Sequence, residues 1–252
     1  MKRKILEKIL DVISVFWRLI PWKLRNYFFL IPILLESRGN HIKAFKRLFE
    51  IEDNLKWVYN ELALRHGKGV HIKHNLMNYY YFFESNIKKN QNVLDIGCGY
   101  GAVAISIAKN MEQIRVTGID IDKEKINKAI RNNHSKNLKF IHGDAFEIKP
   151  FKVDVIILSN VLEHIEHRED FIVRVKKIFN PSLFLIRVPD FERDWTIPFR
   201  KEIGTNYFSD STHYIEHTEK EFRNEMHRSG LQIISLTKNW SEIWAICENK
   251  VE

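Results

Sequence analysis

A regular alternation of short apolar runs with amphipathic helical segments begins at residue 92 and constrains the fold more than any other feature of the chain. Five runs rich in β-branched residues predict strands at 92–96, 115–119, 138–142, 153–159 and 182–188. Amphipathic segments between them predict helices at 101–110, 123–134 and 167–179. Strands that are joined by crossover helices run parallel. The alternation therefore predicts an α/β fold with a doubly wound sheet.

The last segment of the chain departs from this alternation. A helix predicted at 218–229 is followed by Gly230, a typical residue just after a helix end, and two strands are predicted at 232–237 and 242–248. The connection between these strands is too short for a crossover helix, so the pair must be antiparallel. The whole pattern predicts a Rossmann-like seven-stranded sheet, mostly parallel with an antiparallel last strand, preceded by N-terminal helices.

Residues 1–40 are predicted to form a basic amphipathic helical segment, because apolar residues recur there at helical spacing among many Lys and Arg residues. The uncharged run 26–35 contains Pro32 and is shorter than the roughly 20 residues that span a bilayer. Trp17 and Trp22, with cations beside them, would suit residues 1–35 lying on a membrane surface. The alternatives are packing on the protein's own domain or on a second subunit of a homodimer.

Residues 41–90 are predicted to be a helical lead that caps the sheet. A Gly67-Lys68-Gly69 break interrupts it, and a helix rich in aromatic residues is expected at 71–83. The main domain is expected at 91–252. Within it, the stretch 189–217 is far longer than the usual connection of about four to six residues, which suggests a lid over a bound ligand.

The composition narrows the class of protein. With 252 residues, of which 44% are hydrophobic, the chain can form one α/β domain with a packed core and an appendage. Cys98 and Cys247 lie far apart without metal-ligand spacing, and no signal-peptide cleavage site follows the apolar N-terminus. We therefore expect a cytoplasmic protein, with the inner face of the membrane as the alternative location. The net charge of +8 favours an anionic partner without selecting one.

A glycine-rich turn, Asp95-Ile96-Gly97-Cys98-Gly99-Tyr100-Gly101, joins the first predicted strand to its helix. Glycines let the backbone turn tightly and approach a ligand, while the N–H groups of the helix start face it. Gly97, Gly99 and Ala102 also satisfy a dinucleotide-binding pattern. Asp120, at the end of the second strand, can accept ribose hydroxyls of any adenosine ligand. The turn alone therefore leaves a dinucleotide and S-adenosylmethionine as alternatives.

Three further features favour S-adenosylmethionine. Asp95 precedes the first glycine, where a carboxylate would repel a pyrophosphate but suits an ammonium group. Asp144 follows the third strand, where it can accept a hydrogen bond from an adenine amino group. The fourth strand runs into Asn160-Val161-Leu162-Glu163-His164. With these motifs, residues 92–188 resemble the class I S-adenosylmethionine-dependent methyltransferases, in particular the small-molecule branch with Val-Leu-Glu-His after the fourth strand.

The resemblance implies that S-adenosylmethionine is the cofactor. It also implies the cofactor-binding residues Asp95, Gly97, Cys98, Gly99, Asp120, Ile121, Asp144, Ala145, Asn160 and Val161. Among these, Ile121 is expected to pack on the adenine and Asn160 to lie beside the sulfonium. The chain departs from the family at the turn before the fifth strand, where Asn180-Pro181-Ser182 replaces the usual Pro-Gly-Gly. That turn is structural in the family, so cofactor binding is still expected.

A sulfonium already activates the methyl group, so the protein must align an acceptor and help to remove its proton if the acceptor is a hydroxyl. His164, after the fourth strand, is the first candidate base, and His213 and His217 of the long insertion are the others. Each has a structural alternative, as a helix-start histidine or a solvated loop residue. Glu163, His164 and His167 match no zinc signature in their spacing, so no metal site is expected.

The predicted function is O-methylation of a polar small molecule, a sugar or a lipid-linked glycan. The helical lead and the insertion from Val188-Pro189-Asp190-Phe191 to His213 resemble uncharacterised bacterial and archaeal methyltransferases of surface-glycan pathways. The alternatives are a methyltransferase for a soluble metabolite or a tRNA, and a non-catalytic S-adenosylmethionine-binding or membrane-docking scaffold. The expected partner is a small-molecule or glycan acceptor. Nucleic acid is not favoured, because no ribbon of stacked aromatic and basic residues is present.

Overall fold

A computed structural model describes residues 2–67 and 69–249, with the side chains of residues 2–8 outside the description. Lys68 of the predicted glycine break and the first residues of the predicted basic helix therefore lie partly or wholly outside the described residues. The chain divides into two compact units, Met1–Arg65 and His66–Glu252. Each unit is described by itself.

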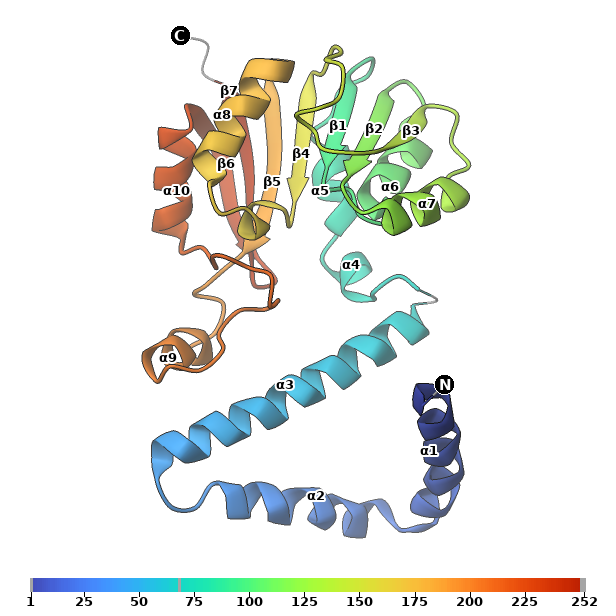
Figure 1. Cartoon of the computed structure of the whole chain (residues 1–252), viewed down its shortest axis with the longest axis vertical. Coiled ribbons are helices and arrows are strands. Elements are labelled where there is room, and N and C mark those ends of the chain that lie inside the picture. Colours follow the sequence, from blue (N-terminus) through green and yellow to red (C-terminus); the bar gives the residue numbers. More distant parts are fainter. Residues whose placement is uncertain (1, 68, 250–252) are drawn as a thin grey trace. The chain divides into compact units, whose positions relative to one another are not determined.

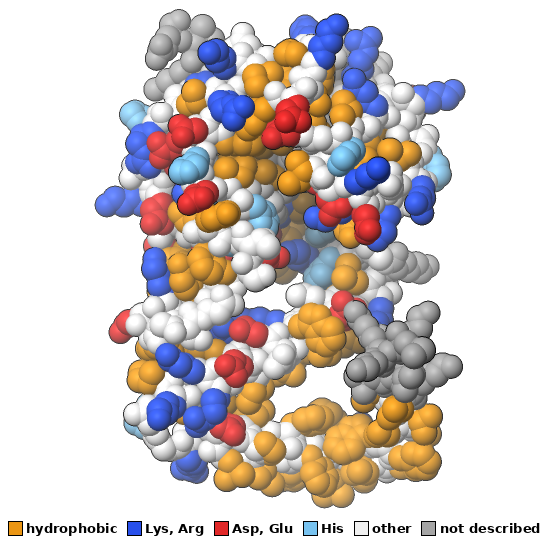
Figure 2. Space-filling model, viewed as in Figure 1, with side chains coloured by type: hydrophobic (Ala, Val, Ile, Leu, Met, Phe, Trp, Pro, Cys, Tyr) orange, Lys and Arg blue, Asp and Glu red, His pale blue; other side chains and the backbone are white. Residues whose placement is uncertain are grey.

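The first unit is helical. The predicted basic segment forms two helices, α1 (Lys2–Leu19) and α2 (Trp22–Glu36), because Pro21 cannot continue α1 and instead precedes the first turn of α2. No residue of α2 is buried, and Figure 2 shows hydrophobic side chains gathered along this helix. The third helix, α3 (His41–His66), forms the first part of the predicted helical lead and ends just before Gly67. Among the described residues, no helix is both long and apolar enough to cross a membrane.

The aromatic-rich segment that opens the second unit is not the single helix predicted at 71–83. It forms α4 (Lys73–Leu76) and α5 (Tyr79–Glu84), separated at Asn78, whose φ of 52° is left-handed. Asparagine tolerates this conformation better than most residues, because its short polar side chain can bond locally. The break turns the following aromatic side chains toward the sheet, where Tyr79 and Phe83 are buried.

The predicted seven-stranded sheet is confirmed, with the strand order β3-β2-β1-β4-β5-β7-β6 (Figure 1). Its parallel strands are β1 (Asn92–Ile96), β2 (Arg115–Asp120), β3 (Leu138–His142), β4 (Val155–Ser159) and β5 (Leu183–Pro189). As expected, β7 (Glu242–Asn249) is antiparallel, and it pairs with both β5 and β6 (Leu231–Asn239). The parallel strands are joined by α6 (Ala102–Asn110), α7 (Lys123–Asn132) and α8 (Arg168–Phe179).

Alternate residues of the central strands build two cores on opposite faces of the sheet. Leu94 of β1 belongs to the core under α8 and α10 (Glu219–Arg228), which lie on one face of the sheet in Figure 1. Val93 belongs to the second core, under α5 and α6. Strands buried on both faces read as continuous apolar runs, which is why the sequence reveals them. Polar side chains therefore gather where these strands end, at the carboxyl edge of the sheet.

Candidate active site

The carboxyl ends of the parallel strands place the predicted cofactor-binding residues along one edge of the sheet. The turn after β1 is fixed by backbone bonds: the N–H groups of Gly97 and Cys98 donate to the carbonyl oxygen of Ile119 at 2.8 and 3.0 Å. The N–H of Gly99 donates to Oδ2 of Asp120 at 2.8 Å. The glycine turn is thereby held against the end of β2, as an adenosine site at this edge requires.

Two positions of the turn require glycine, because neighbouring side chains lie too close for a Cβ atom. Gly97 has a φ of 70°, and a Cβ at this position would lie 2.7 Å from Cγ2 of Val161. Gly101, with a φ of 79°, precedes α6, and a Cβ there would collide with the ring of Phe140. A Cβ on Gly99 would meet no atom within 4 Å, so the space over this residue is open. The turn is therefore closely packed at Gly97 and Gly101, whereas the space beside Gly99 is open.

Asp95 is a buried carboxyl group with an unsatisfied oxygen. The residue is 2% exposed, and its Oδ2 has no hydrogen-bond partner among the described residues. Burial, reinforced by the nearby charge of Asp120, raises the pKa of Asp95 to about 8. Buried polar atoms in proteins are nearly always paired. An ammonium group would satisfy Asp95, so this residue fits the methionine end of S-adenosylmethionine.

The ends of β2 and β3 carry the residues predicted to hold the adenosine. Asp120 accepts from the N–H of Asp122 with Oδ1, which aligns its carboxylate at the sheet edge. Ile121 is apolar yet 77% exposed, and thus offers a surface on which a purine can pack. Asp144 is exposed, whereas Ala145 is buried in the core, so only the backbone of Ala145 is available to a ligand. These residues fit an adenosine; their predicted contacts with it stay predictions.

The segment after β4 joins the cofactor edge to the candidate acceptor site. Asn160 has a left-handed φ of 57°, and its backbone N–H donates to the carbonyl oxygen of Arg187 at 2.9 Å. Its Nδ2 donates to Oε1 of Glu163 at 3.1 Å. Val161 packs over Gly97, so its side chain supports the glycine turn. The segment continues as the short 3₁₀ helix η1 (Leu162–His164).

Glu163 is fully buried, which sequence reasoning did not anticipate. Its Oε2 has no hydrogen-bond partner among the described residues, and burial raises the pKa of this carboxyl to about 7. The only local signal was a charged residue within an otherwise apolar turn. A buried carboxyl with a raised pKa beside a ligand site is typical of functional positions.

His164 and His213, two of the three predicted catalytic histidines, come together beside Glu163. Their rings lie edge to face with centroids 4.6 Å apart, and one ligand atom from each of the three residues lies within 4.8 Å of the others. The insertion is bound to η1 by the N–H of Tyr214, which donates to the carbonyl oxygen of Glu163 at 2.8 Å. Burial and the nearby His213 lower the pKa of His164. We name these three residues the Glu-His-His cluster.

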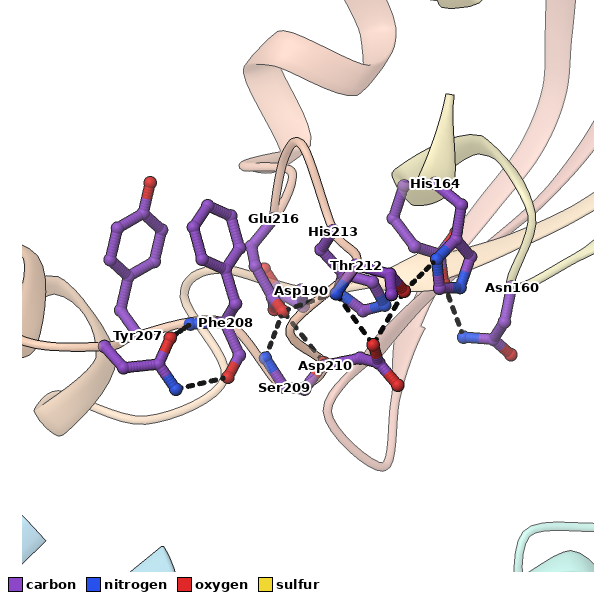
Figure 3. Close-up of polar contacts among 12 residues, drawn as sticks. Asn160, His164, Asp190, Tyr207, Phe208, Ser209, Asp210, Thr212, His213 and Glu216 are labelled. Atoms are coloured by element: carbon purple, nitrogen blue, oxygen red, sulfur yellow. Dashed lines mark hydrogen bonds and ion pairs between the residues drawn. The ribbon is translucent and has the colours of Figure 1, made fainter. Parts of the chain in front are cut away.

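Hydrogen bonds set the proton positions on both rings. Nδ1 of His164 lies 2.8 Å from Oγ1 of Thr212, which donates its own proton to Oδ1 of Asp210 at 2.7 Å, as Figure 3 shows. These bonds from Thr212 hold the pKa of Asp210 below its usual value, so Asp210 is an acceptor. The hydroxyl oxygen of Thr212 therefore accepts a hydrogen bond from Nδ1–H of His164. The lone pair of the neutral ring is then on Nε2.

His213 is fixed in the same tautomer by Glu216. Its Nδ1 lies 3.0 Å from Oε1 of Glu216, which also forms an ion pair with Arg193 through Oε2. Burial alone would raise the pKa of Glu216, but the bonds from His213 and Ser209 and the charge of Arg193 lower it overall. The ionised carboxylate of Glu216 accepts a hydrogen bond from Nδ1–H of His213. The lone pair of the neutral His213 ring is then on Nε2.

The third predicted catalytic histidine, His217, lies outside this cluster. Its ring is fully buried against Phe222, and its Nε2 lies 3.2 Å from Oε1 of Glu225. Glu225 also pairs with Arg168 of α8. The position links the end of the insertion to α10 and α8, which indicates a structural role for His217.

The insertion itself is folded rather than open loop. It contains α9 (Thr196–Glu202), and it begins and ends side by side, since Asp190 and His217 form a β-bridge. Glu216 lies at its centre and bonds to Ser209 and His213 (Figure 3). It also forms an ion pair with Arg193. These contacts position His213 next to η1. The insertion is thus an ordered segment, and its role as a lid stays a prediction.

Arg187 is a second residue that sequence reasoning missed. It lies on β5 with 1% exposure, forms an ion pair with Glu242 of β7 and places its guanidinium carbon 3.8 Å from the ring centroid of Tyr79. Tyr79 in turn bonds to Ser159 at the end of β4 through a 3.0 Å contact between hydroxyls. An arginine inside an apolar strand was the available signal.

Comparisons with known proteins agree with this geometry. A family model described as a methyltransferase domain matches residues 87–246. The release factor glutamine methyltransferase of Streptococcus pneumoniae is 32% identical over 131 residues, which are 50% of this chain and 45% of that protein. The fatty-acid O-methyltransferase of Mycolicibacterium smegmatis is 27% identical over 115 residues, 42% of each chain. The chain spans less than half the length of these curated relatives.

Solved structures share the fold at low sequence identity. Magnesium protoporphyrin IX methyltransferase from Synechocystis, solved with bound SAH, superimposes with a TM-score of 0.55 at 16% identity and covers 90% of this chain and 99% of its own. A SAM-dependent methyltransferase from Aquifex aeolicus gives a TM-score of 0.55 at 16% identity, with 68% and 89% covered. The match of the family model over more than half of the chain, together with this fold, is decisive. The chain belongs to the methyltransferase-domain family of the class I fold, and S-adenosylmethionine is its cofactor.

Proposed function

We propose that this protein methylates an oxygen atom of a polar small molecule, a sugar or a lipid-linked glycan. When bound, S-adenosylmethionine supplies an activated methyl group: the acceptor oxygen bonds to the methyl carbon, the carbon–sulfur bond breaks with its electron pair left on sulfur, and the hydroxyl proton leaves. The single observation that supports a hydroxyl acceptor is the Glu-His-His cluster, which follows the cofactor edge directly through Asn160 and Val161.

The cluster offers the means to remove a hydroxyl proton. In the neutral form of each ring the lone pair is on Nε2, and from there either histidine can accept the proton as a general base. Thr212, which donates to Asp210, accepts from Nδ1 of His164. Glu216 accepts from Nδ1 of His213, so each ring has an acceptor that stabilises it when it becomes protonated. An amide or amine acceptor, as in the glutamine methyltransferase relatives, is the alternative chemistry.

Asp120 provides the test of cofactor binding. Asp120→Ala should abolish binding in calorimetry, because its carboxylate both faces the ribose position and holds the N–H of Gly99. Calorimetry that detects no binding of S-adenosylmethionine to the wild-type protein would reject the enzyme proposal.

A methyl-transfer screen with labelled cofactor should include sugars, sugar nucleotides, glycolipids, free hydroxylated metabolites and tRNA. Transfer to a hydroxyl of a sugar, a sugar nucleotide or a glycolipid supports the proposal, whereas transfer to free metabolites alone would favour the soluble-metabolite alternative. Transfer to tRNA or to nitrogen would replace the proposal. Cofactor binding without any transfer would favour a non-catalytic scaffold.

The first unit supports an acceptor at a membrane surface. Large hydrophobic side chains of α1 and α2 are exposed, among them Phe16, Leu19, Trp22, Phe28, Ile31 and Leu35. Arg25 lies over the ring of Trp22, with the guanidinium carbon 5.5 Å from its centroid. Apolar and aromatic side chains beside cations are typical of helices that lie in the interface of anionic bilayers.

Liposome sedimentation of the full chain tests this placement. Ile31→Glu should weaken binding to vesicles of anionic lipid, whereas Asn26→Glu adds the same charge to α2 without removing an apolar side chain. Equal binding by both variants, or no vesicle binding by the wild type, would contradict the membrane proposal. Dimers that Ile31→Glu dissociates in light scattering would show instead that the apolar surface binds a second subunit.

A further inference from the structure

The Glu-His-His cluster combines side chains from two segments that are far apart in sequence. Glu163 and His164 belong to η1, after β4, whereas His213 belongs to the insertion after β5. Each offers one ligand atom, and the three atoms lie within 4.8 Å of one another. Spacing along the sequence could not reveal this set, because its third member comes from a folded loop.

The hydrogen bonds of the two histidine rings suit a metal ion. Metal binding to histidine requires a neutral ring, and the second nitrogen of such a ring usually donates to a carboxylate or another acceptor. Both rings have such an outer partner, since His164 donates from Nδ1 to Thr212 and His213 donates from Nδ1 to Glu216. The lone pair of each ring is then on Nε2.

Glu163 supplies an independent indication of a cation-binding site. The side chain is fully buried, its Oε1 accepts from Asn160, and its Oε2 has no hydrogen-bond partner among the described residues. A buried carboxylate oxygen without a partner is costly in a folded protein. A cation between Glu163 and the two histidines would satisfy this oxygen.

We propose that Glu163, His164 and His213 bind a divalent transition metal ion of the zinc class. Two imidazole nitrogens and one carboxylate oxygen form a ligand set typical of catalytic zinc sites, which keep a position open. Imidazole suits zinc and its neighbours, whereas Mg²⁺ prefers an all-oxygen set. The exposed side of His164 leaves the open position accessible to an acceptor.

The role of the metal rests on the proposed function, because the acceptor oxygen would occupy the open position. A bound divalent ion lowers the pKa of a coordinated hydroxyl, so that the proton is lost to water and the oxygen becomes a better nucleophile. The two histidines then act as ligands rather than as the direct base. Thr212 and Glu216 are positioning residues, which orient the rings.

Metal binding to the full-length, chelator-treated protein is measured first, by calorimetry with Zn²⁺ and by the visible spectrum with Co²⁺, without cofactor or acceptor. The wild type should bind one Zn²⁺ per chain, and Mg²⁺ in excess should not compete. His213→Ala and Glu163→Gln should each weaken binding by more than about 100-fold, since loss of an outer partner alone costs about 10- to 100-fold. Thr212→Val should weaken Zn²⁺ binding by about 10- to 100-fold, because it removes only the outer partner of His164.

His167→Ala is the matched control, because it removes an exposed histidine of the same segment that is not a member of the cluster. Circular dichroism confirms that each variant is folded, and Thr212→Val keeps all three ligands if a ligand variant fails to fold. Absence of Zn²⁺ binding by the wild type, or binding that these variants leave unchanged, would overturn the site. Zn²⁺ binding with no methyl transfer to any hydroxyl would keep the site but reject the proposed function. Full transfer after chelation would overturn the role of the metal in catalysis.

Discussion

Val161 packs directly over Gly97, so that a methyl group added to Gly97 would lie 2.7 Å from Cγ2 of Val161. Gly97 follows β1 and Val161 follows β4, two strands that are neighbours in the sheet. The contact couples the cofactor turn to the segment that carries Glu163 and His164. Substitutions at Gly97 or Val161 should therefore disturb both the cofactor turn and the segment that carries Glu163 and His164.

Gly97→Ala should lower the free energy of unfolding by about 2 to 5 kcal/mol. The left-handed conformation costs a non-glycine residue about 1 to 2 kcal/mol, and the collision with Val161 adds an overpacking cost of about 1 to 3 kcal/mol. Urea denaturation measures the change, and calorimetry should show weaker cofactor binding. Gly99→Ala is the control, because Gly99 is also left-handed but its Cβ would meet no atom within 4 Å. Equal losses in both variants would show that the contact with Val161 does not matter.

Cofactor binding should release a proton near pH 7 through Asp95. Burial raises the pKa of this carboxyl to about 8 in the unbound protein, whereas pairing with an ammonium group requires the ionised form. Affinity should therefore rise with pH between about 5 and 7.5. Calorimetry in two buffers of different ionisation enthalpy counts the proton, and Asp95→Asn should bind weakly with no proton released. Wild-type binding without proton release would contradict the assignment.

The same shift predicts a pH-dependent stability of the unbound protein. The folded pKa of Asp95, about 8, lies above its ordinary value of 3.8. Its contribution to stability is therefore complete below pH 3.8 and is lost as the pH rises through about 8. Urea midpoints should show wild type losing stability relative to Asp95→Asn over this range. Parallel pH profiles for the two proteins would be the contrary result.

The fold could be predicted because its signals are local. Strands buried on both faces are continuous apolar runs, and the glycine turn sits where β1 meets α6. The break of the aromatic segment at Asn78 was missed, because asparagine in a left-handed conformation leaves no glycine or proline signal. The break between α1 and α2 had a signal in Pro21, but the apolar periodicity on both sides concealed it.

The candidate site was only half predictable. Residues of the cofactor edge follow from motifs at strand ends, since parallel strands finish at the same edge. The approach of His213 to Glu163 depends on the folding of the whole insertion around Glu216, and no local pattern encodes it. Among three candidate histidines, the sequence could not tell that His217 pairs with Glu225 instead.

Thr218 starts α10 with a capping box, which should contribute measurably to stability. Its Oγ1 accepts from the N–H of Glu221 at 3.2 Å, while Glu221 accepts from the N–H of Thr218 at 2.9 Å. Thr218→Ala should cost about 1 kcal/mol, and Thr218→Ser, which keeps the hydroxyl, should cost little. Thermal unfolding compares the two. A loss in Thr218→Ser as large as in Thr218→Ala would point to the methyl group rather than to the cap.

Arg187 and Glu242 form a buried ion pair between β5 and β7, and their energies should be strongly coupled. Arg187→Met leaves buried Glu242 with one ion pair among the described residues, to the half-exposed Lys73, whose Nζ lies 3.8 Å from Oε1. Removal of one partner from a buried pair typically costs about 3 to 5 kcal/mol, because the other charge stays uncompensated. Glu242→Gln should be costly for the same reason.

The double variant Arg187→Met with Glu242→Gln should be considerably more stable than the sum of the two single losses implies, since it buries no unpaired charge. Urea denaturation of all four proteins completes the double-mutant cycle. Arg187→Lys keeps the charge but loses the planar group that stacks on Tyr79, so it should lie between wild type and Arg187→Met. Additive losses across the cycle would mean that the two side chains stabilise the sheet independently, through packing against Tyr79 and Trp244 rather than through their charges.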